Sequence, residues 1–278
     1  MKILIQIIFV LIELSSFSQD FNHFDYNKRL DWAPFENEKV TVDFLKNNFP
    51  DSVIDEYFKE FIIKHPELFH FFDIDSDQVD ELIYNGWNGG EGEMVTIYKQ
   101  SGNRFIENQN FLGRIVEIKI TPSRFPQMIV YDYSCCAGIV DHLQTFDFND
   151  STGQFEIVKA IVKIVNTEIP KEWIEPKRFE ILNSPYYLRY SPEIVSGISD
   201  IDYEFKPLIG QNIAALYKKG DQGTVYSETK DSTGRIWWFV VMDSKPDDEN
   251  MLFYEGNNEF DNYQPIGWMS SKFLKELE

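Results

Sequence analysis

Residues 234–241 read Gly-Arg-Ile-Trp-Trp-Phe-Val-Val, and residues 266–274 read Ile-Gly-Trp-Met-Ser-Ser-Lys-Phe-Leu. β-Branched and aromatic residues fill both stretches, so each is predicted to form a β-strand, the second ending in a turn and a short terminal strand. Successive side chains of a strand point to opposite faces, so one of Trp237 and Trp238 is expected to face the core and the other to face outward. The C-terminal part of the chain is therefore predicted to be a small unit built of β-strands.

Four further segments lie in a fixed order before these strands: residues 186–192 (YYLRYSP), 213–220 (IAALYKKG), 223–228 (GTVYSE) and the turn 231–234 (DSTG). Together with the tryptophan-containing stretches, they resemble bacterial SH3-like (SH3b) domains over about ninety residues. The resemblance implies an SH3-like β-barrel over residues 181–278 that binds cell-wall peptides, glycans or proteins and does not itself catalyse a reaction. The sequence departs from the family by insertions near residues 199–210 and 244–262, the second of them acidic.

The same resemblance implies that aromatic side chains of this domain form its ligand-binding groove. The residues concerned are Tyr186, Tyr217, Trp237, Trp238, Tyr254 and Trp268. The alternative is that these side chains complete the core of a small barrel, because aromatic residues bury large apolar areas.

Acidic residues alternate with other residues in the stretch 73–81, Asp-Ile-Asp-Ser-Asp-Gln-Val-Asp-Glu. Calcium takes six to eight oxygen ligands, which one short loop can supply from alternate positions. The predicted set is the carboxylates of Asp73, Asp75, Asp77 and Glu81 with the backbone carbonyl of Val79. An EF-hand is excluded, because it needs Gly at the sixth place and Glu at the twelfth, where this chain has Gln78 and Tyr84.

This acidic stretch resembles the Asp-rich loops of FG-GAP or VCBS-type propeller repeats, which precede a strand that starts with Leu-Ile or Leu-Val. The resemblance implies bound calcium. Gln78 departs from it, because it replaces the usual Gly, the residue that adopts positive φ without strain. The alternative is a metal-free Asx-type turn whose carboxylates accept hydrogen bonds from backbone N–H groups.

Two segments that start near Glu81 and Gln127 have the same succession of strand, loop, strand, turn and strand. Their separation of roughly fifty residues is the span of one antiparallel propeller-type blade. Apolar residues repeat at helical spacing over residues 52–64, which predicts a helix. We therefore expect a mainly β fold, with a propeller-blade-like antiparallel β-meander and a small N-terminal helical cap over residues 20–180, followed by the SH3-like barrel.

The first nineteen residues have the pattern of a cleaved secretory signal peptide. Lys2 precedes an apolar run at residues 3–14, which is followed by Ser-Ser-Phe-Ser-Gln. The run is too short to span a membrane comfortably, and no later segment is long enough. The end of the segment resembles signal peptides of Bacteroidetes-type bacteria, which implies a secreted or periplasmic protein of a Gram-negative bacterium with a mature chain starting near Asp20.

The chain carries 46 acidic and 26 basic residues, a formal net charge of −20. This balance argues against nucleic-acid binding and against docking on anionic lipids, and self-repulsion favours a monomer. The two cysteines, Cys135 and Cys136, are adjacent and cannot build a disulfide framework within one chain. They form either a strained vicinal disulfide or two thiols in a tight loop.

These observations predict a non-catalytic binding protein of the bacterial cell envelope, whose partner is a cell-wall peptide, a glycan or an envelope protein. One alternative is an envelope hydrolase that uses Cys136, with His142 as base, or a metal in the acidic loop. Another is a secreted inhibitor whose acidic insertion blocks a basic partner.

Overall fold

The computed structural model describes residues 21–48, 61, 63–90, 92–120, 125–133, 139–195, 212–246 and 263–277. Strands dominate these residues, and the prediction of a mainly β fold with antiparallel sheets is confirmed. The chain divides into two compact units. The meander unit comprises Tyr26–Ala137 and Leu143–Lys159, and the C-terminal unit comprises Met1–Asp25, Gly138–His142 and Ala160–Glu278.

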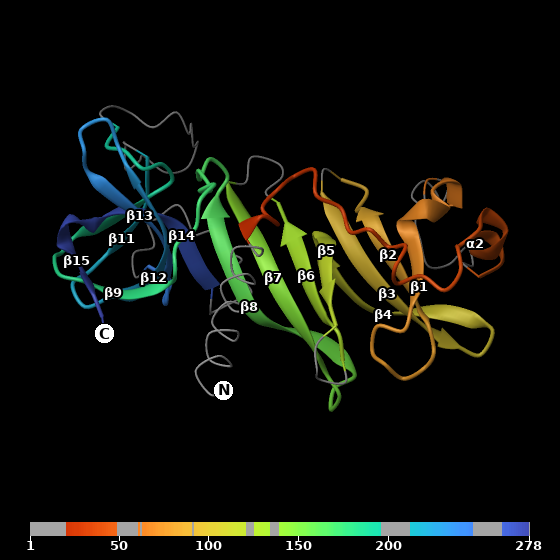
Figure 1. Cartoon of the computed structure of the whole chain (residues 1–278). Coiled ribbons are helices and arrows are strands. Elements are labelled where there is room, and N and C mark those ends of the chain that lie inside the picture. Colours follow the sequence, from red (N-terminus) through yellow and green to blue (C-terminus); the bar gives the residue numbers. More distant parts are fainter. Residues whose placement is uncertain are drawn as a thin grey trace, which may run out of the picture. The chain divides into compact units, whose positions relative to one another are not determined.

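The first sheet of the meander unit is four-stranded and antiparallel, with the strands in chain order. Its strands are β1 (Phe69–Phe72), β2 (Glu81–Trp87), β3 (Glu93–Ser101) and β4 (Arg104–Leu112) (Figure 1). The β3–β4 hairpin turns at Gly102, which has a φ of 62°. This meander covers the first of the two predicted repeat segments.

Strand β5 (Arg114–Lys119) and the second predicted repeat, which starts near Gln127, form another run of strands in chain order. The strands of this repeat are β6 (Gln127–Asp132), β7 (Val140–Asn149) and β8 (Gln154–Ile164). Gly113 joins β4 to β5 with a φ of 99°, and a Cβ at this position would lie 2.7 Å from the carbonyl oxygen of Tyr131. A side chain is therefore excluded from the connection between the two meanders.

Apolar side chains from the two meanders pack in one core cluster, which includes Ile83, Val95, Ile115, Val130 and Phe146. They come from alternate positions of strands that are apolar on the face toward the core, the expected pattern for packed antiparallel sheets. The meander unit is therefore stabilised by burial of apolar surface between its two sheets.

A short helix, α2 (Val42–Asn48), covers part of the first sheet. The hydroxyl oxygen of Thr41 accepts a hydrogen bond from the N–H of Phe44 at 3.2 Å, which caps the helix N-terminus. Leu45 is fully buried against the cluster that contains Phe69 and Leu82. Most of the helix predicted over residues 52–64 lies outside the described residues, although residues 61, 63 and 64 are helical.

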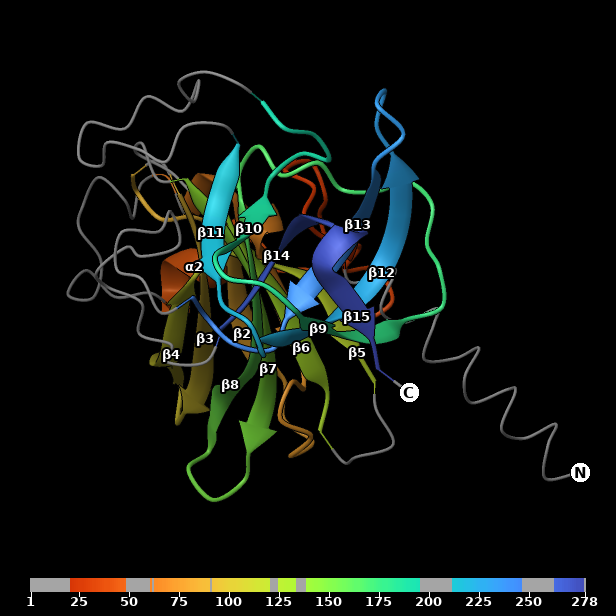
Figure 2. The same cartoon turned by 90° about the vertical axis from the view of Figure 1, so that its left-hand side faces the viewer.

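The C-terminal unit consists mainly of short strands. They are β9 (Lys177–Ile181), β10 (Tyr186–Arg189), β11 (Ile213–Tyr217), β12 (Gln222–Lys230), β13 (Ile236–Met242), β14 (Tyr263–Ser270), the 3₁₀ turn η2 (Ser271–Phe273) and β15 (Leu274–Glu276). The main path runs β15-β9-β12-β13-β14, and several of these strands face the viewer in Figure 2.

The described strands of this unit do not close into a barrel. Strand β14 pairs with β13 and has two further neighbours. It pairs in parallel with residues 160–162 of β8, and it pairs with β10 where Trp268 lies opposite Arg189. The terminal strand β15 pairs with β9. Among the described strands, β15 pairs only with β9 and β11 only with β10, so the ring that the sequence led us to expect stays open there.

The division between the units falls at residues 159 and 160, earlier than the expected domain boundary at residue 180. Residues before β9 pack within the C-terminal unit: the ring of Trp173 stacks on Phe21 at 5.1 Å and meets Phe239 at 6.0 Å. The segment around Trp173 is therefore a structural element of the C-terminal unit.

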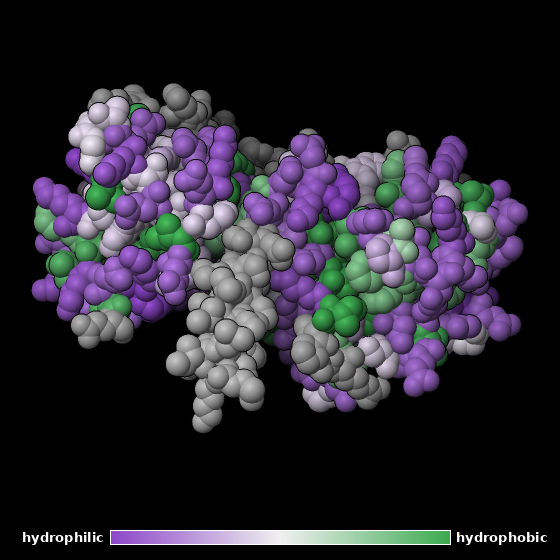
Figure 3. Space-filling view, in the orientation of Figure 1, coloured by the Kyte–Doolittle hydropathy of each residue, from purple (hydrophilic) through white to green (hydrophobic). Residues whose placement is uncertain are grey.

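Hydrophilic side chains cover most of the surface seen in Figure 3, and hydrophobic side chains occur there in separate small groups. None of the helices that the structure describes has the length and apolar character needed to cross a membrane.

Candidate functional site

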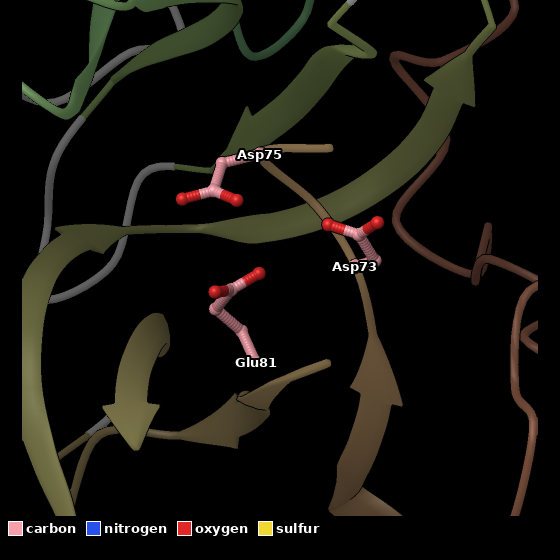
Figure 4. A group of neighbouring side chains, drawn as sticks. All are labelled: Asp73, Asp75 and Glu81. Carbon is pink, nitrogen blue, oxygen red and sulfur yellow. The ribbon is translucent and has the colours of Figure 1, made fainter. Parts of the chain in front are cut away.

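The acidic loop connects β1 to β2 and brings three of its carboxylates together. One oxygen from each of Asp73, Asp75 and Glu81 lies within 4.8 Å of the others. Figure 4 shows the three carboxylates grouped around a common space. Carboxylate oxygens are the ligand atoms that a hard cation prefers, so this part of the predicted set has the right donor type.

Backbone N–H groups of the same loop already bind several of these oxygens. Asp73 accepts hydrogen bonds from the N–H groups of Asp77, at 2.9 Å, and Gln78, at 3.0 Å. Asp77 accepts from the N–H of Val79 at 2.8 Å, and Glu81 accepts from the N–H of Ile74 at 3.1 Å. These are the contacts of the metal-free Asx-type turn.

Burial gives the acidic loop unusual electrostatics. Asp75 and Glu81 are both buried, and the Lys99 ammonium on β3 forms an ion pair with Asp75. Burial, followed by the nearby charge of Asp75, raises the pKa of Glu81 to about 8. Glu81 is therefore mostly protonated at neutral pH, and a bound cation would have to displace its proton.

The two remaining members of the predicted ligand set, Asp77 and Val79, are more exposed than the three gathered carboxylates. Asp77 is exposed and is not among the three gathered carboxylates. The Val79 side chain is 47% exposed. Gln78 has a φ of 76°, the left-handed conformation that glycine would adopt without strain. The loop thus has at this position the backbone conformation that favours glycine, although the residue there is glutamine.

The predicted aromatic ligand-binding residues of the C-terminal unit are mostly buried. Trp237, Trp268, Tyr186 and Tyr217 belong to the core. The indole N–H of Trp237 donates to Asp231 at 2.9 Å, and that of Trp268 donates to the carbonyl of Glu168 at 2.7 Å. These four side chains therefore do not line an open groove, and they fit the alternative that they complete the core.

Trp238 is half-buried, and its indole N–H donates to Glu228 at 2.9 Å. The strand alternation predicted for Trp237 and Trp238 is therefore observed, with Trp237 in the core. Tyr254, Cys135 and Cys136 lie outside the described residues, so the structure does not place them.

A pocket of about 460 Å³ lies elsewhere in the C-terminal unit. It is lined by the segment after β8, the segment after β10 and the turn between β12 and β13. Its charged side chains are Glu168, Glu193, Asp231 and Arg235, and Pro192 and Ile194 add apolar surface. Sequence reasoning missed this pocket, because it treated residues 231–234 only as a hairpin turn.

The charges in this pocket are unevenly paired. The guanidinium of Arg235 lies 5.8 Å from the ring of Trp237 and has no hydrogen bond or ion pair within the described ranges. Burial and the nearby charge of Glu193 raise the pKa of Glu168. Hydrogen bonds from Thr233 and Trp237 lower the pKa of Asp231. The pocket therefore presents an available cation and two mutually repelling carboxylates.

Comparisons of the chain with protein-family models, with curated proteins and with solved structures found no match.

Proposed function

We propose that this chain is an exported, non-catalytic binding protein of a bacterial cell envelope, and that its C-terminal unit binds a short cell-wall peptide. The observation that carries the proposal is the available guanidinium of Arg235 in a pocket shared with the carboxylates of Glu168 and Glu193. The order of strands β12, β13 and β14, followed by the turn η2 and the terminal strand β15, supports an SH3-like module.

The pocket suits a ligand that carries both charges. Arg235 presents a planar fork of donors that matches a ligand carboxylate, and such pairs are among the stronger hydrogen-bonded contacts. Burial, followed by the charge of Glu193, raises the pKa of Glu168, and a ligand ammonium between the two carboxylates would stabilise their charged forms. Peptide termini and diamino acids of cell-wall peptides supply these two groups together, and Ile194, 49% exposed, offers apolar contact.

Co-sedimentation of the full mature chain with purified peptidoglycan tests this function, with calorimetric titration of a soluble cell-wall tripeptide as the second measurement. We expect Arg235→Ala to weaken binding by about tenfold or more, because it removes a charged hydrogen-bond donor. Lys230→Ala is the matched control, since Lys230 is exposed on the same hairpin and does not line the pocket. Equal binding by the two variants would overturn the proposal.

The same assay separates the rival functions. If the parent chain releases soluble fragments from peptidoglycan and the Cys136→Ala variant does not, a hydrolase is favoured. Binding only to a basic protein, lost when the salt concentration is raised, would favour an acidic inhibitor.

We also propose calcium as a ligand of the acidic loop, supported by the closeness of the Asp73, Asp75 and Glu81 carboxylates. Calcium must compete with Lys99 for Asp75 and with the proton of Glu81, so we expect weak binding that strengthens above pH 8. The test compares melting temperatures in millimolar calcium and in chelator at pH 6 and pH 9. A higher melting temperature in calcium than in chelator at pH 9, abolished by Asp73→Asn, supports the site. Equal melting temperatures in calcium and in chelator at both pH values reject it.

A further inference from the structure

The meander unit contains a second pocket, of about 430 Å³, formed where α2, β1, the acidic loop and the β3–β4 hairpin meet. This volume lies within the range of small-molecule sites in proteins. The pocket is built by segments far apart in the sequence, from Glu38 to Phe105, so no single motif encodes it.

Three phenylalanines form the apolar part of this pocket. The rings of Phe44 and Phe71 lie 5.1 Å apart, and those of Phe44 and Phe105 lie 5.7 Å apart, both edge to face. Phe71 is buried, whereas Phe44 and Phe105 are half-buried and keep part of their ring surface accessible. Val79, 47% exposed, extends this apolar surface.

Five planar polar side chains complete the described lining: the carboxylates of Glu38 and Asp80 and the amides of Asn48, Gln100 and Asn103. None of the described lining residues is basic. Both oxygens of Asp80 accept from the amide of Asn37, at 3.2 and 3.1 Å, which fixes this carboxylate and offsets part of its charge. The rim thus offers hydrogen-bond donors and acceptors together.

We propose that this pocket binds a neutral sugar residue of a glycan. A pyranose ring has an apolar C–H face that packs on accessible phenyl rings, and hydroxyls that can both donate to carboxylates and accept from amides. An anionic ligand would meet two carboxylates and no cation among the described lining residues. A cation could use only the acceptors of the rim and could not use its amide N–H groups, while an alkyl chain would make no polar contact with the rim. One N–H of Asn48 donates to the carbonyl of Phe44 at 2.9 Å, and one N–H of Gln100 donates to the carbonyl of Gly102 at 3.2 Å. Each of these amides has a second N–H that can donate to a sugar hydroxyl.

This inference concerns a different unit and different residues from the peptide pocket around Arg235, so either proposal can fail while the other stands.

The experiment titrates the full mature chain with cello-, malto-, manno- and chito-tetraose by isothermal calorimetry. We expect at least one of these neutral oligosaccharides to bind, with an affinity unchanged when the salt concentration is raised about tenfold, because no ion pair is involved. Phe105→Ala should weaken that binding by about tenfold or more through the loss of ring contact.

Ile106→Ala is the matched control, because Ile106 is the next residue of β4, is 56% exposed and does not line the pocket. Gln100→Ala, at an exposed rim position, gives a second variant that leaves the phenylalanine cluster intact. Binding lost in Phe105→Ala and weakened in Gln100→Ala, but kept in Ile106→Ala, supports the sugar site. No binding by any of the four sugars, or equal binding by all three variants, overturns it.

Discussion

The side-chain amide of Gln109 in β4 binds both backbone polar groups of Phe155 in β8. Its Nε2 donates to the carbonyl of Phe155 at 2.7 Å, and the N–H of Phe155 donates to its Oε1 at 2.8 Å. Asn85 in β2 makes the equivalent pair of contacts with the backbone of Ile115 in β5, at 3.1 and 3.5 Å. Each amide replaces a strand partner at an edge that would otherwise carry unpaired polar groups.

Replacing Gln109 should therefore destabilise the meander unit. Gln109→Leu leaves the N–H and C=O of Phe155 without these partners, and we expect the free energy of unfolding to fall by about 1–3 kcal/mol. Urea denaturation measures the change. Asn110→Ala is the control, because Asn110 is exposed and should alter stability by less than about 0.5 kcal/mol. An equal loss in both variants would contradict the bridging role.

Gly113→Ala should destabilise the chain more than Gly102→Ala. Both glycines have positive φ, but a Cβ at Gly113 would lie 2.7 Å from the Tyr131 carbonyl oxygen, whereas nothing lies within 4 Å at Gly102. We expect about 1 kcal/mol at Gly102 from backbone strain alone. The loss at Gly113 should be larger by at least about 1 kcal/mol, because the backbone must shift. Similar melting temperatures for the two variants would show that the connection is not tightly packed.

Glu81 should make stability depend on pH. Its pKa in the folded chain, about 8, lies above the ordinary value of 4.5, so folding takes up a proton between these values. The stabilisation is fully present below pH 4.5 and is lost as the pH rises through 8, by on the order of a few kcal/mol.

Glu81→Gln imitates the protonated carboxyl and should remove this component of the pH dependence. The variant should unfold close to the parent at pH 4, below both pKa values, and at a higher temperature than the parent at pH 9, in the presence of chelator. If the melting temperatures of the two proteins change equally with pH across this range, the assignment to Glu81 is refuted. Glu175→Gln, at an exposed position, serves as the control for loss of a charge.

The ion pair between Lys163 and Asp141 is buried, with both side chains 6% exposed and their charged atoms 2.6 Å apart. Lys163→Met should cost about 3–5 kcal/mol, because it leaves a buried carboxylate without its cation. The exposed pair of Lys177 and Glu276, at 3.3 Å, gives the comparison, and Lys177→Met should change stability by less than about 1 kcal/mol. Chemical denaturation measures the stability of both variants. Equal losses of stability would contradict the expectation that the contribution of an ion pair depends on its burial.

Much of the strand content could be predicted from the sequence because strand formation follows local composition and turn residues. The two meanders follow their Gly- and Asn-containing turns, and Trp237 and Trp238 alternate between core and surface as a strand requires. The acidic loop was also identifiable, because its carboxylates are near neighbours in the chain.

The candidate peptide pocket could not be predicted in this way. Glu168, Glu193 and Arg235 come from three separated segments, and the sequence does not show that these segments meet. Nor does the sequence show that Lys99, on a neighbouring strand, places its ammonium on Asp75. Such contacts depend on which strands pair and in what register.

The sequence by itself determined that this chain is mainly β, with two repeated meanders, an acidic turn and a C-terminal strand unit, because periodicity and turn chemistry act over a few residues. Only the tertiary structure decided that β14 pairs with β8, that the C-terminal strands do not close a ring, that most of the predicted aromatic ligands are buried, and which charges share a pocket. These outcomes depend on competition between strand edges and on burial, which arise from contacts between residues distant in the chain.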